Sequence, residues 1–139
     1  MATIAAEWRV LESAFDELNL WDLPGRHIYW WSGGTSVSTD IPRDDIREAL
    51  AEALRNGLVQ LYDQADRDYP VFELDEALSL VSEESEWTAE CARRGAALTI
   101  TPAGEVASHA VFERFRAASP FLALGIADPQ VIDPEATDS

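Results

Sequence analysis

The sequence predicts a single α+β domain, mainly helical, with short strands that lie far apart along the chain. Apolar residues recur at spacings of three and four in the segments 4–18, 46–54 and 106–115, which is typical of amphipathic helices. The segments 58–62 and 97–100 are short and rich in apolar residues, as buried strands are. A chain of 139 residues can bury a core without a disulfide or a metal ion.

The first predicted helix, over residues 4–18, ends ahead of the Leu23-Pro24-Gly25 run, which stops helices. Residues 26–31, Arg-His-Ile-Tyr-Trp-Trp, fit either a strand or a short helix, because so brief an apolar run suits both. Residues 32–36, Ser-Gly-Gly-Thr-Ser, predict a flexible loop.

The clearest local unit is a helix that runs directly into a strand. Pro42 marks the helix start, and Asp44 and Asp45 suit the positive N-terminal end of its dipole. The Asn56-Gly57 pair predicts the end of the helix, with Gly in the left-handed conformation. The strand over 58–62 follows at once.

The second half of the chain predicts an acidic turn over 63–69, a helix over 73–82 and a strand over 97–100. Thr101 and Pro102 then fit the N-cap and first position of a last helix. The residues expected in the core are Trp8, Leu11, Phe15, Leu50, Leu54, Leu58, Leu98, Ile100, Val111 and Phe115.

Two strings of residues carry a resemblance to a known family. Residues 49–62, Ala-Leu-Ala-Glu-Ala-Leu-Arg-Asn-Gly-Leu-Val-Gln-Leu-Tyr, look like a third helix running into a first wing strand. Residues 98–105, Leu-Thr-Ile-Thr-Pro-Ala-Gly-Glu, look like the returning wing strand and the start of a final helix. The chain thus resembles bacterial winged-helix (winged helix-turn-helix) proteins over roughly residues 4–116. The resemblance implies one winged-helix-like domain over 1–126.

Two departures from the family pattern shape what the resemblance implies. Residues 63–96, with their predicted helix, must form an extended wing or a helical insertion between the two wing strands, where a simple wing is a short hairpin. The helix that would enter the DNA groove carries four acids beside its arginines, whereas groove-reading helices depend on cationic contacts. Beyond the domain, residues 127–139 contain two Pro and four acids, and we expect a disordered acidic tail.

The charge of the chain is its most unusual global property. Ten Arg, no Lys and 26 Asp plus Glu give a formal net charge of −16. Such a field repels phosphate backbones and anionic membranes and attracts basic partners. We therefore expect a basic protein partner, with no nucleic acid and no membrane, although an acidic bias that serves only solubility explains the same composition.

The ends of the chain and its cysteine usage bear on the compartment. The N-terminus lacks the basic and apolar regions of a signal peptide, and no segment reaches the roughly 20 apolar residues that span a bilayer. Cys91 is the only cysteine, so no intramolecular disulfide can form. These features lead us to expect a cytoplasmic protein.

No motif predicts an enzyme, a cofactor or a metal. His27 and His109 lack the spacing of metal ligands, and we expect His109 to be a packing or surface residue. Cys91 has no nearby His, and we expect a partly buried structural thiol. The acids of residues 63–73 imitate a calcium loop but lack its Gly and its terminal Glu, so we expect no specific calcium site.

Two features are candidates for partner binding. Residues 63–90 hold ten acids against the single Arg67, and charged residues on a loop held by a scaffold are often functional. One of the adjacent aromatic residues before the Gly-rich loop is a candidate interface anchor. The candidate partner-binding residues are Asp63, Asp66, Asp68, Glu83, Glu84, Trp30 and Trp31. The alternatives are a merely solvated insertion and two tryptophans packed under the loop.

These observations favour a non-catalytic acidic module that docks on a basic partner. In size and charge it is similar to immunity proteins that neutralise basic nucleases, and to antagonists that occupy a nucleic-acid site. One alternative is a winged-helix DNA-binding transcriptional regulator with Arg43, Arg47, Arg55, Arg93 and Arg94 on one face. Another is a dimerisation scaffold, since the sequence leaves a homo-oligomer open.

Overall fold

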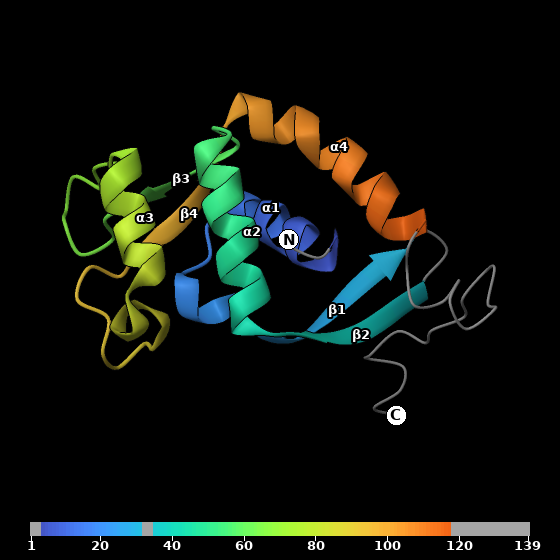
Figure 1. Cartoon of the computed structure of the whole chain (residues 1–139), viewed down its shortest axis with the longest axis horizontal. Coiled ribbons are helices and arrows are strands. Elements are labelled where there is room, and N and C mark those ends of the chain that lie inside the picture. The colour runs from blue at the N-terminus through green and yellow to red at the C-terminus, as the bar shows by residue number, and fades with distance from the viewer. Residues whose placement is uncertain (1–3, 32–34, 118–139) are drawn as a thin grey trace.

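A computed structural model gives the arrangement of residues 4–31 and 35–117, an α+β fold that is mainly helical, as predicted (Figure 1). Its first half contains α1 (Ile4–Phe15), the short 3-10 helix η1 (Leu20–Asp22), β1 (Gly25–Trp31), β2 (Thr35–Ile41) and α2 (Arg43–Arg55). Its second half contains β3 (Val59–Tyr62), α3 (Leu74–Ser82), the 3-10 helix η2 (Glu84–Trp87), β4 (Ala97–Ile100) and α4 (Pro102–Ala117).

Helix α1 lies at the centre of the molecule and contacts α2, α4 and β4. In Figure 1, α2 crosses near it, α4 runs along the upper edge, and α3 lies with β3 and β4 at the left. Val10 and Leu11 on α1 are buried, as are Ile46 and Leu50 on α2. The apolar stripes predicted for these two helices therefore meet in one core.

The predicted junction of α2 with the following strand is confirmed. Gly57 has φ +70°, donates its N–H to the Leu54 carbonyl at 3.1 Å, and is followed by Leu58, whose N–H donates to the Ala53 carbonyl at 2.9 Å. These two bonds make a Schellman motif, in which Gly takes the left-handed conformation without the steric cost that a Cβ brings.

Strands β3 and β4 pair antiparallel, with Leu61 opposite Leu98. Both edges of this pair are covered, because Val71 bridges to Tyr62 and Asn19 bridges to Ala97. Leu61 and Leu98 are fully buried beneath the pair. The opposite face, on which Tyr62 lies, is left to form part of the site described below.

The start of α4 lies against the start of β3. The Thr101 hydroxyl accepts the Gly104 N–H at 3.0 Å, which confirms Thr101 as the N-cap, and donates toward the Leu58 carbonyl at 2.9 Å. A Cβ at Gly104 would lie 2.0 Å from that same carbonyl oxygen. Only Gly permits this approach of helix to strand.

The segment between α1 and α2 is a hairpin of β1 and β2, which pair antiparallel from Gly25 opposite Ile41 to Trp31 opposite Thr35. Residues 26–31 are therefore a strand, which resolves the ambiguity of the sequence. The loop expected over 32–36 is wrong for Thr35 and Ser36, which belong to β2. Residues 32–34 lie outside the described part of the chain.

Most of the predicted core residues lie in the core or pack against it. Leu11, Leu50, Leu54 and Leu98 are buried, and Leu58, Ile100, Val111 and Trp8 are partly buried. The Trp8 ring packs against Phe112 at a tilt of 47°, with ring centroids 4.9 Å apart. The prediction for Phe15 is wrong, because α1 ends at that residue and leaves its side chain 48% exposed. The Phe115 side chain lies outside the description.

Two further expectations concern residues outside the described part of the chain. The tail over 127–139 and the end of the predicted domain at residue 126 both lie beyond Ala117, the last described residue. Within the described ranges, no helix has the length and apolar character needed to cross a bilayer.

Candidate functional site

The acidic turn that follows β3 presents two of the predicted binding residues. Asp66 and Asp68 are exposed. The Asp66 carboxylate accepts the Asp68 N–H at 2.9 Å, and the Asp66 carbonyl accepts the Tyr69 N–H at 3.0 Å. The turn therefore holds both carboxylates in water next to Tyr69, where they are available to a partner.

Asp63, at the start of the same turn, has a different position. Its side chain is 6% exposed and accepts two hydrogen bonds from Arg94, at 2.9 Å from Nε and 2.8 Å from Nη2. Its carboxylate also accepts the Ala65 N–H at 3.0 Å. These hydrogen bonds and the Asp63 charge raise the pKa of Arg94. Asp63 fastens the turn to the chain before β4 and does not face solvent.

The acids after α3 also divide between solvent and internal pairs. Glu83 is exposed at the end of α3. Glu84 lies 2.6 Å from Arg43 and 3.1 Å from Arg47, both on α2. The Arg47 guanidinium in turn lies 5.4 Å from the centre of the Trp87 ring. Glu84 thus ties η2 to α2, and its charge is already matched by two arginines.

Glu86 lies in the interior, a position that its sequence context does not predict. It is 2% exposed, and its carboxylate accepts the backbone N–H of Arg93 at 2.7 Å and that of Arg94 at 3.3 Å. A buried carboxylate is tolerated when such hydrogen bonds satisfy it. Within a run of acids, nothing in the local sequence distinguishes this one.

Trp30 and Trp31, the two aromatic candidates, occupy the end of β1. They lie opposite Ser36 and Thr35 of β2 in the hairpin register. The exposure of the two indole rings lies outside what the structure describes, so their role stays a prediction.

An open hollow adjoins the acidic turn on the outer face of β3 and β4. It measures about 440 Å³ and is lined by Glu17, Tyr62, Gln64, Tyr69, Val71 and Thr99. The rings of Tyr62 and Tyr69 meet edge to face at 89°, with centroids 6.1 Å apart. Tyr69 is 58% exposed and Val71 is 49% exposed. Large aromatic surface left in water beside polar groups is typical of interaction sites.

The residues that line this hollow come from three segments of the chain, namely the turn after α1, the stretch from β3 to Val71, and β4. Tyr62 ends β3 and bridges to Val71, which places both side chains at one edge of the strand pair. The Gln64 amide oxygen accepts a hydrogen bond from Asn19 at 2.6 Å, and Asn19 also donates to the Gly95 carbonyl at 3.1 Å. The backbone pairing of Tyr62 with Val71 and the hydrogen bond between Asn19 and Gln64 therefore fix the position of the hollow's walls.

Backbone strain in the described residues gathers at the same hollow. Glu17, with φ 54°, and Tyr69, with φ 49°, are the non-Gly residues of the described chain with positive φ, and both line it. The left-handed conformation costs an L-residue roughly 1–2 kcal/mol. Such strain persists where the surrounding structure enforces it, often at functional positions.

The strain at Glu17 can be compared with an equivalent position in the chain. After α1, Glu17 donates its N–H to the Ala14 carbonyl and Leu18 donates to the Ser13 carbonyl, so α1 ends in the same Schellman motif as α2. At the equivalent left-handed position, α2 has Gly57. The chain thus places a strained carboxylate at the hollow where Gly is the preferred residue.

The Tyr62 hydroxyl stays protonated in this setting. Its partial burial and the nearby Glu17 carboxylate, to which it hydrogen-bonds, raise its pKa above the ordinary value of 10.0. Tyr62 is therefore neutral at physiological pH. The walls of the hollow carry one negative charge, on Glu17, and the six lining residues include no cation.

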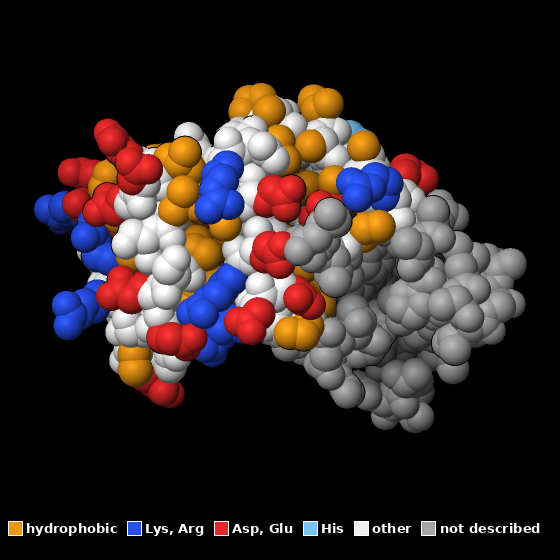
Figure 2. Space-filling view, in the orientation of Figure 1, with side chains coloured by type: hydrophobic (Ala, Val, Ile, Leu, Met, Phe, Trp, Pro, Cys, Tyr) orange, Lys and Arg blue, Asp and Glu red, His pale blue; other side chains and the backbone are white. Residues whose placement is uncertain are grey.

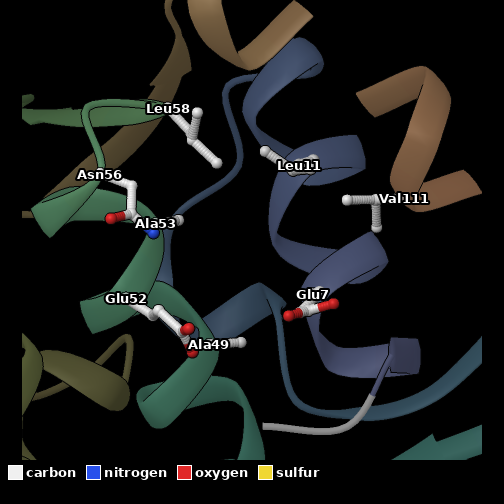
Figure 3. A pocket seen from close by; sticks show the side chains of 8 residues that line it. All are labelled: Glu7, Leu11, Ala49, Glu52, Ala53, Asn56, Leu58 and Val111. Atoms are coloured by element: carbon white, nitrogen blue, oxygen red, sulfur yellow. The ribbon is translucent and has the colours of Figure 1, made fainter. Parts of the chain in front are cut away.

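A second, smaller cavity lies between α1 and α2 beside α4. It measures about 60 Å³, and Figure 3 shows Glu7 and Glu52 on its facing sides with Leu11, Leu58 and Val111 around them. One Glu7 oxygen lies 3.5 Å from Arg114 of α4. A cavity this small holds a few waters and no ligand-sized molecule. We interpret this cavity as a packing gap between α1, α2 and α4.

The remaining candidates for chemistry lie apart. His109 is exposed on α4, in agreement with a surface position, whereas the expectation that Cys91 is partly buried is wrong, because it is exposed. The turn that imitates a calcium loop has Asp63 committed to Arg94. Among the described side chains, no three His, Cys, Asp or Glu residues are grouped to hold a metal ion.

Three of the five arginines proposed for DNA contact are paired with acids of the chain, whereas Arg55 and Arg93 are exposed. Arg43 and Arg47 share the Glu84 carboxylate, and Arg94 is held by Asp63. On the face in Figure 2, the blue groups at the position of α2 are separated by white and orange atoms and have acidic side chains beside them, so no continuous positive stripe follows α2. The acids on this face lie in separate groups among white and orange atoms and do not form an unbroken negative surface. Charged side chains of both signs therefore form small separate groups on this face.

Comparisons with known proteins identify no relative: no family model, no curated protein and no solved structure matches this chain.

Proposed function

We propose that this protein is a non-catalytic module that binds a basic protein partner in the cytoplasm, in the manner of an immunity protein or an antagonist. The observation that carries the proposal is the pairing of Arg43 and Arg47 with Glu84. That pairing engages Arg43 and Arg47 with a carboxylate of the chain itself, while Asp66 and Asp68 stay in water beside an aromatic hollow.

Electrostatics favours this partner over a nucleic acid. A protein that binds DNA neutralises phosphates with free Arg and Lys, and the affinity then depends steeply on salt. Here the described arginines of α2 and of the segment before β4 are mostly paired, and the chain carries a net charge of −16. A partner with a basic surface is instead attracted to this acidic chain at long range, and the attraction raises the association rate.

The winged-helix resemblance is part of the proposal. We assign α2 as the third helix, β3 and β4 as the wing strands, and α4 as the closing helix, with residues 63–96 inserted between the wing strands. The antiparallel pairing of β3 with β4 supports this assignment. The β1–β2 hairpin stands ahead of α2, where the sequence suggested only a short element. In this assignment the insertion supplies the binding surface, and α2 serves as scaffold.

The test compares two probes at 150 mM NaCl. We expect a fluorescein-labelled nona-arginine peptide to bind, with an association rate that falls as salt rises, and a 20-base-pair duplex DNA not to bind at 10 µM protein. A mobility shift of the DNA that weakens in Arg47→Ala would contradict the proposal and favour the transcriptional regulator.

The contribution of the acidic turn is measured separately. Changing Asp66 and Asp68 together to Asn removes two exposed charges and should lower the association rate several-fold, since charges at the rim of an interface act mainly on encounter. The double change of Glu48 and Glu52 to Gln on α2 is the charge-matched control, and it should have a smaller effect. Equal effects of the two pairs would assign the attraction to net charge alone.

A further inference from the structure

We propose that the hollow lined by Tyr62 and Tyr69 binds one arginine side chain of the basic partner. The inference rests on the proposed function and adds the residue that the site recognises. The hollow combines two tyrosine rings, the Glu17 carboxylate and the apolar side chain of Val71.

The aromatic walls have the geometry that a guanidinium needs. The Tyr62 and Tyr69 rings contact each other edge to face at 89°, with centroids 6.1 Å apart, so together they form an aromatic corner on the wall of the hollow. Tyr69 is 58% exposed, which leaves its surface open to an incoming group. A cation that packs on the face of a tyrosine ring is attracted by the ring's electrons.

The charge of the hollow is complementary to a cation. Glu17 is exposed and lies on its wall, and Asp66 and Asp68 belong to the turn that leads into Tyr69. The nearby Arg94 is held by Asp63 and lies 5.0 Å from the centre of the Phe72 ring, and Arg67, which is exposed on the same turn, is not among the residues that line the hollow. An arginine from outside therefore meets a carboxylate that no lining residue neutralises.

The residues that form the hollow are kept at a cost to stability. Glu17 and Tyr69 both adopt the left-handed conformation, in which Gly or Asn is more stable. α2 uses Gly57 in the same motif, which shows that the chain accommodates Gly at such a position. With Glu17 and Tyr69 at these two positions, the hollow gains a carboxylate and an aromatic ring and the fold loses some stability. A trade of stability for binding accounts for both residues.

Arginine fits this hollow better than lysine. Its planar guanidinium stacks on an aromatic face and at the same time presents a fork of donors that matches a carboxylate such as Glu17. The lysine ammonium is a compact and strongly hydrated charge that must give up more of its water in such a corner.

The experiment measures fluorescence anisotropy of labelled nona-arginine and nona-lysine at 150 mM NaCl with three proteins. Tyr69→Asn removes the ring but tolerates the left-handed backbone and leaves the net charge unchanged. Val106→Asn is the matched control, because it makes the same replacement at an apolar residue that is 75% exposed on α4. Thermal unfolding shows that each variant is folded, and Tyr69→Asn should unfold at the same or a higher temperature.

We expect wild type to bind nona-arginine about fivefold more tightly than nona-lysine, within the range that cation–π contacts supply. Tyr69→Asn should abolish that preference and Val106→Asn should keep it. Equal binding of the two peptides by wild type, or an arginine preference that survives in Tyr69→Asn, overturns the hollow as a binding site for arginine but leaves the proposed basic partner standing. Binding of neither peptide overturns both proposals.

Discussion

Gly104 gives the sharpest test of how α4 docks on β3. In Gly104→Ala, the new Cβ would lie 2.0 Å from the Leu58 carbonyl oxygen and 3.0 Å from the Ile100 side chain, so α4 must move away from the strand. Overpacking of this kind costs about 1–3 kcal/mol. The movement also weakens the Thr101 cap, at about 1 kcal/mol, while Ala in place of Gly returns about 1 kcal/mol of helix propensity. The net expectation is a loss of about 2 kcal/mol.

The assay is urea unfolding followed by tryptophan fluorescence. With a slope of about 2 kcal/mol per molar urea, a loss of that size lowers the midpoint by about 1 M. Val106→Ala, at a residue 75% exposed on the same helix, is the control and should shift the midpoint little. A Gly104→Ala midpoint equal to or above that of wild type would refute the close approach of α4 to β3.

Three further predictions concern the interior, the hollow and the end of α1. Glu86→Ala should lose about 2–4 kcal/mol of unfolding free energy, because the N–H groups of Arg93 and Arg94 lose the acceptor that the buried Glu86 carboxylate provides, whereas Glu86→Gln should lose less; equal urea midpoints for wild type and Glu86→Ala would refute this role. The raised pKa of Tyr62 means that its contribution to stability is fully present below pH 10 and is lost as pH rises through the folded-state value, since the unfolded chain releases the proton first. Wild type should therefore lose stability above pH 10 more steeply than Tyr62→Phe, and identical slopes in urea unfolding against pH would contradict the environment described for Tyr62. Phe15→Ala should cost only about 1 kcal/mol, because the ring is half exposed, against about 3 kcal/mol for the fully buried Leu50→Ala; a similar loss for both would show that Phe15 is buried after all.

The parts of the fold that were predictable from sequence are those with strong local signals. The Asn56-Gly57 pair specifies the Schellman end of α2, and Thr101-Pro102 specifies the start of α4, because each signal acts within one turn of helix. The apolar spacing around Leu50 likewise gave the buried face of α2. These features depend on neighbours in the chain and on little else.

What escaped prediction depends on contacts between distant segments or on weak signals. β2, with the sequence Thr-Ser-Val-Ser-Thr-Asp-Ile, carries little apolar alternation, so its pairing with β1 left no clear pattern. The hollow joins Glu17, Tyr62 and Thr99, which only the register of β3 with β4 and the end of α1 bring together. The usual signal of a Schellman motif is Gly, and α1 has Glu17 there.

The environment of each acid in the segment 63–90 was likewise not predictable from sequence. The ten acids of this segment look alike in sequence, yet Asp63 and Glu86 are interior, Glu84 is paired with α2, and Asp66 and Asp68 are in water. The difference is set by which arginine or backbone N–H lies nearby after folding. Composition therefore leads to the hypothesis of a basic partner, but it does not distinguish the acids that are exposed from those that are paired or buried.

The most direct test of this account is a map of amide chemical shifts in ¹⁵N-labelled protein titrated with nona-arginine at 150 mM NaCl. We predict that the largest changes fall on Glu17, Tyr62, Gln64, Tyr69 and Val71, with smaller ones on the turn at 65–68 and little change on α2 and α4. Changes centred on α2, or spread evenly over all exposed acids, would contradict a basic partner that docks at the tyrosine hollow.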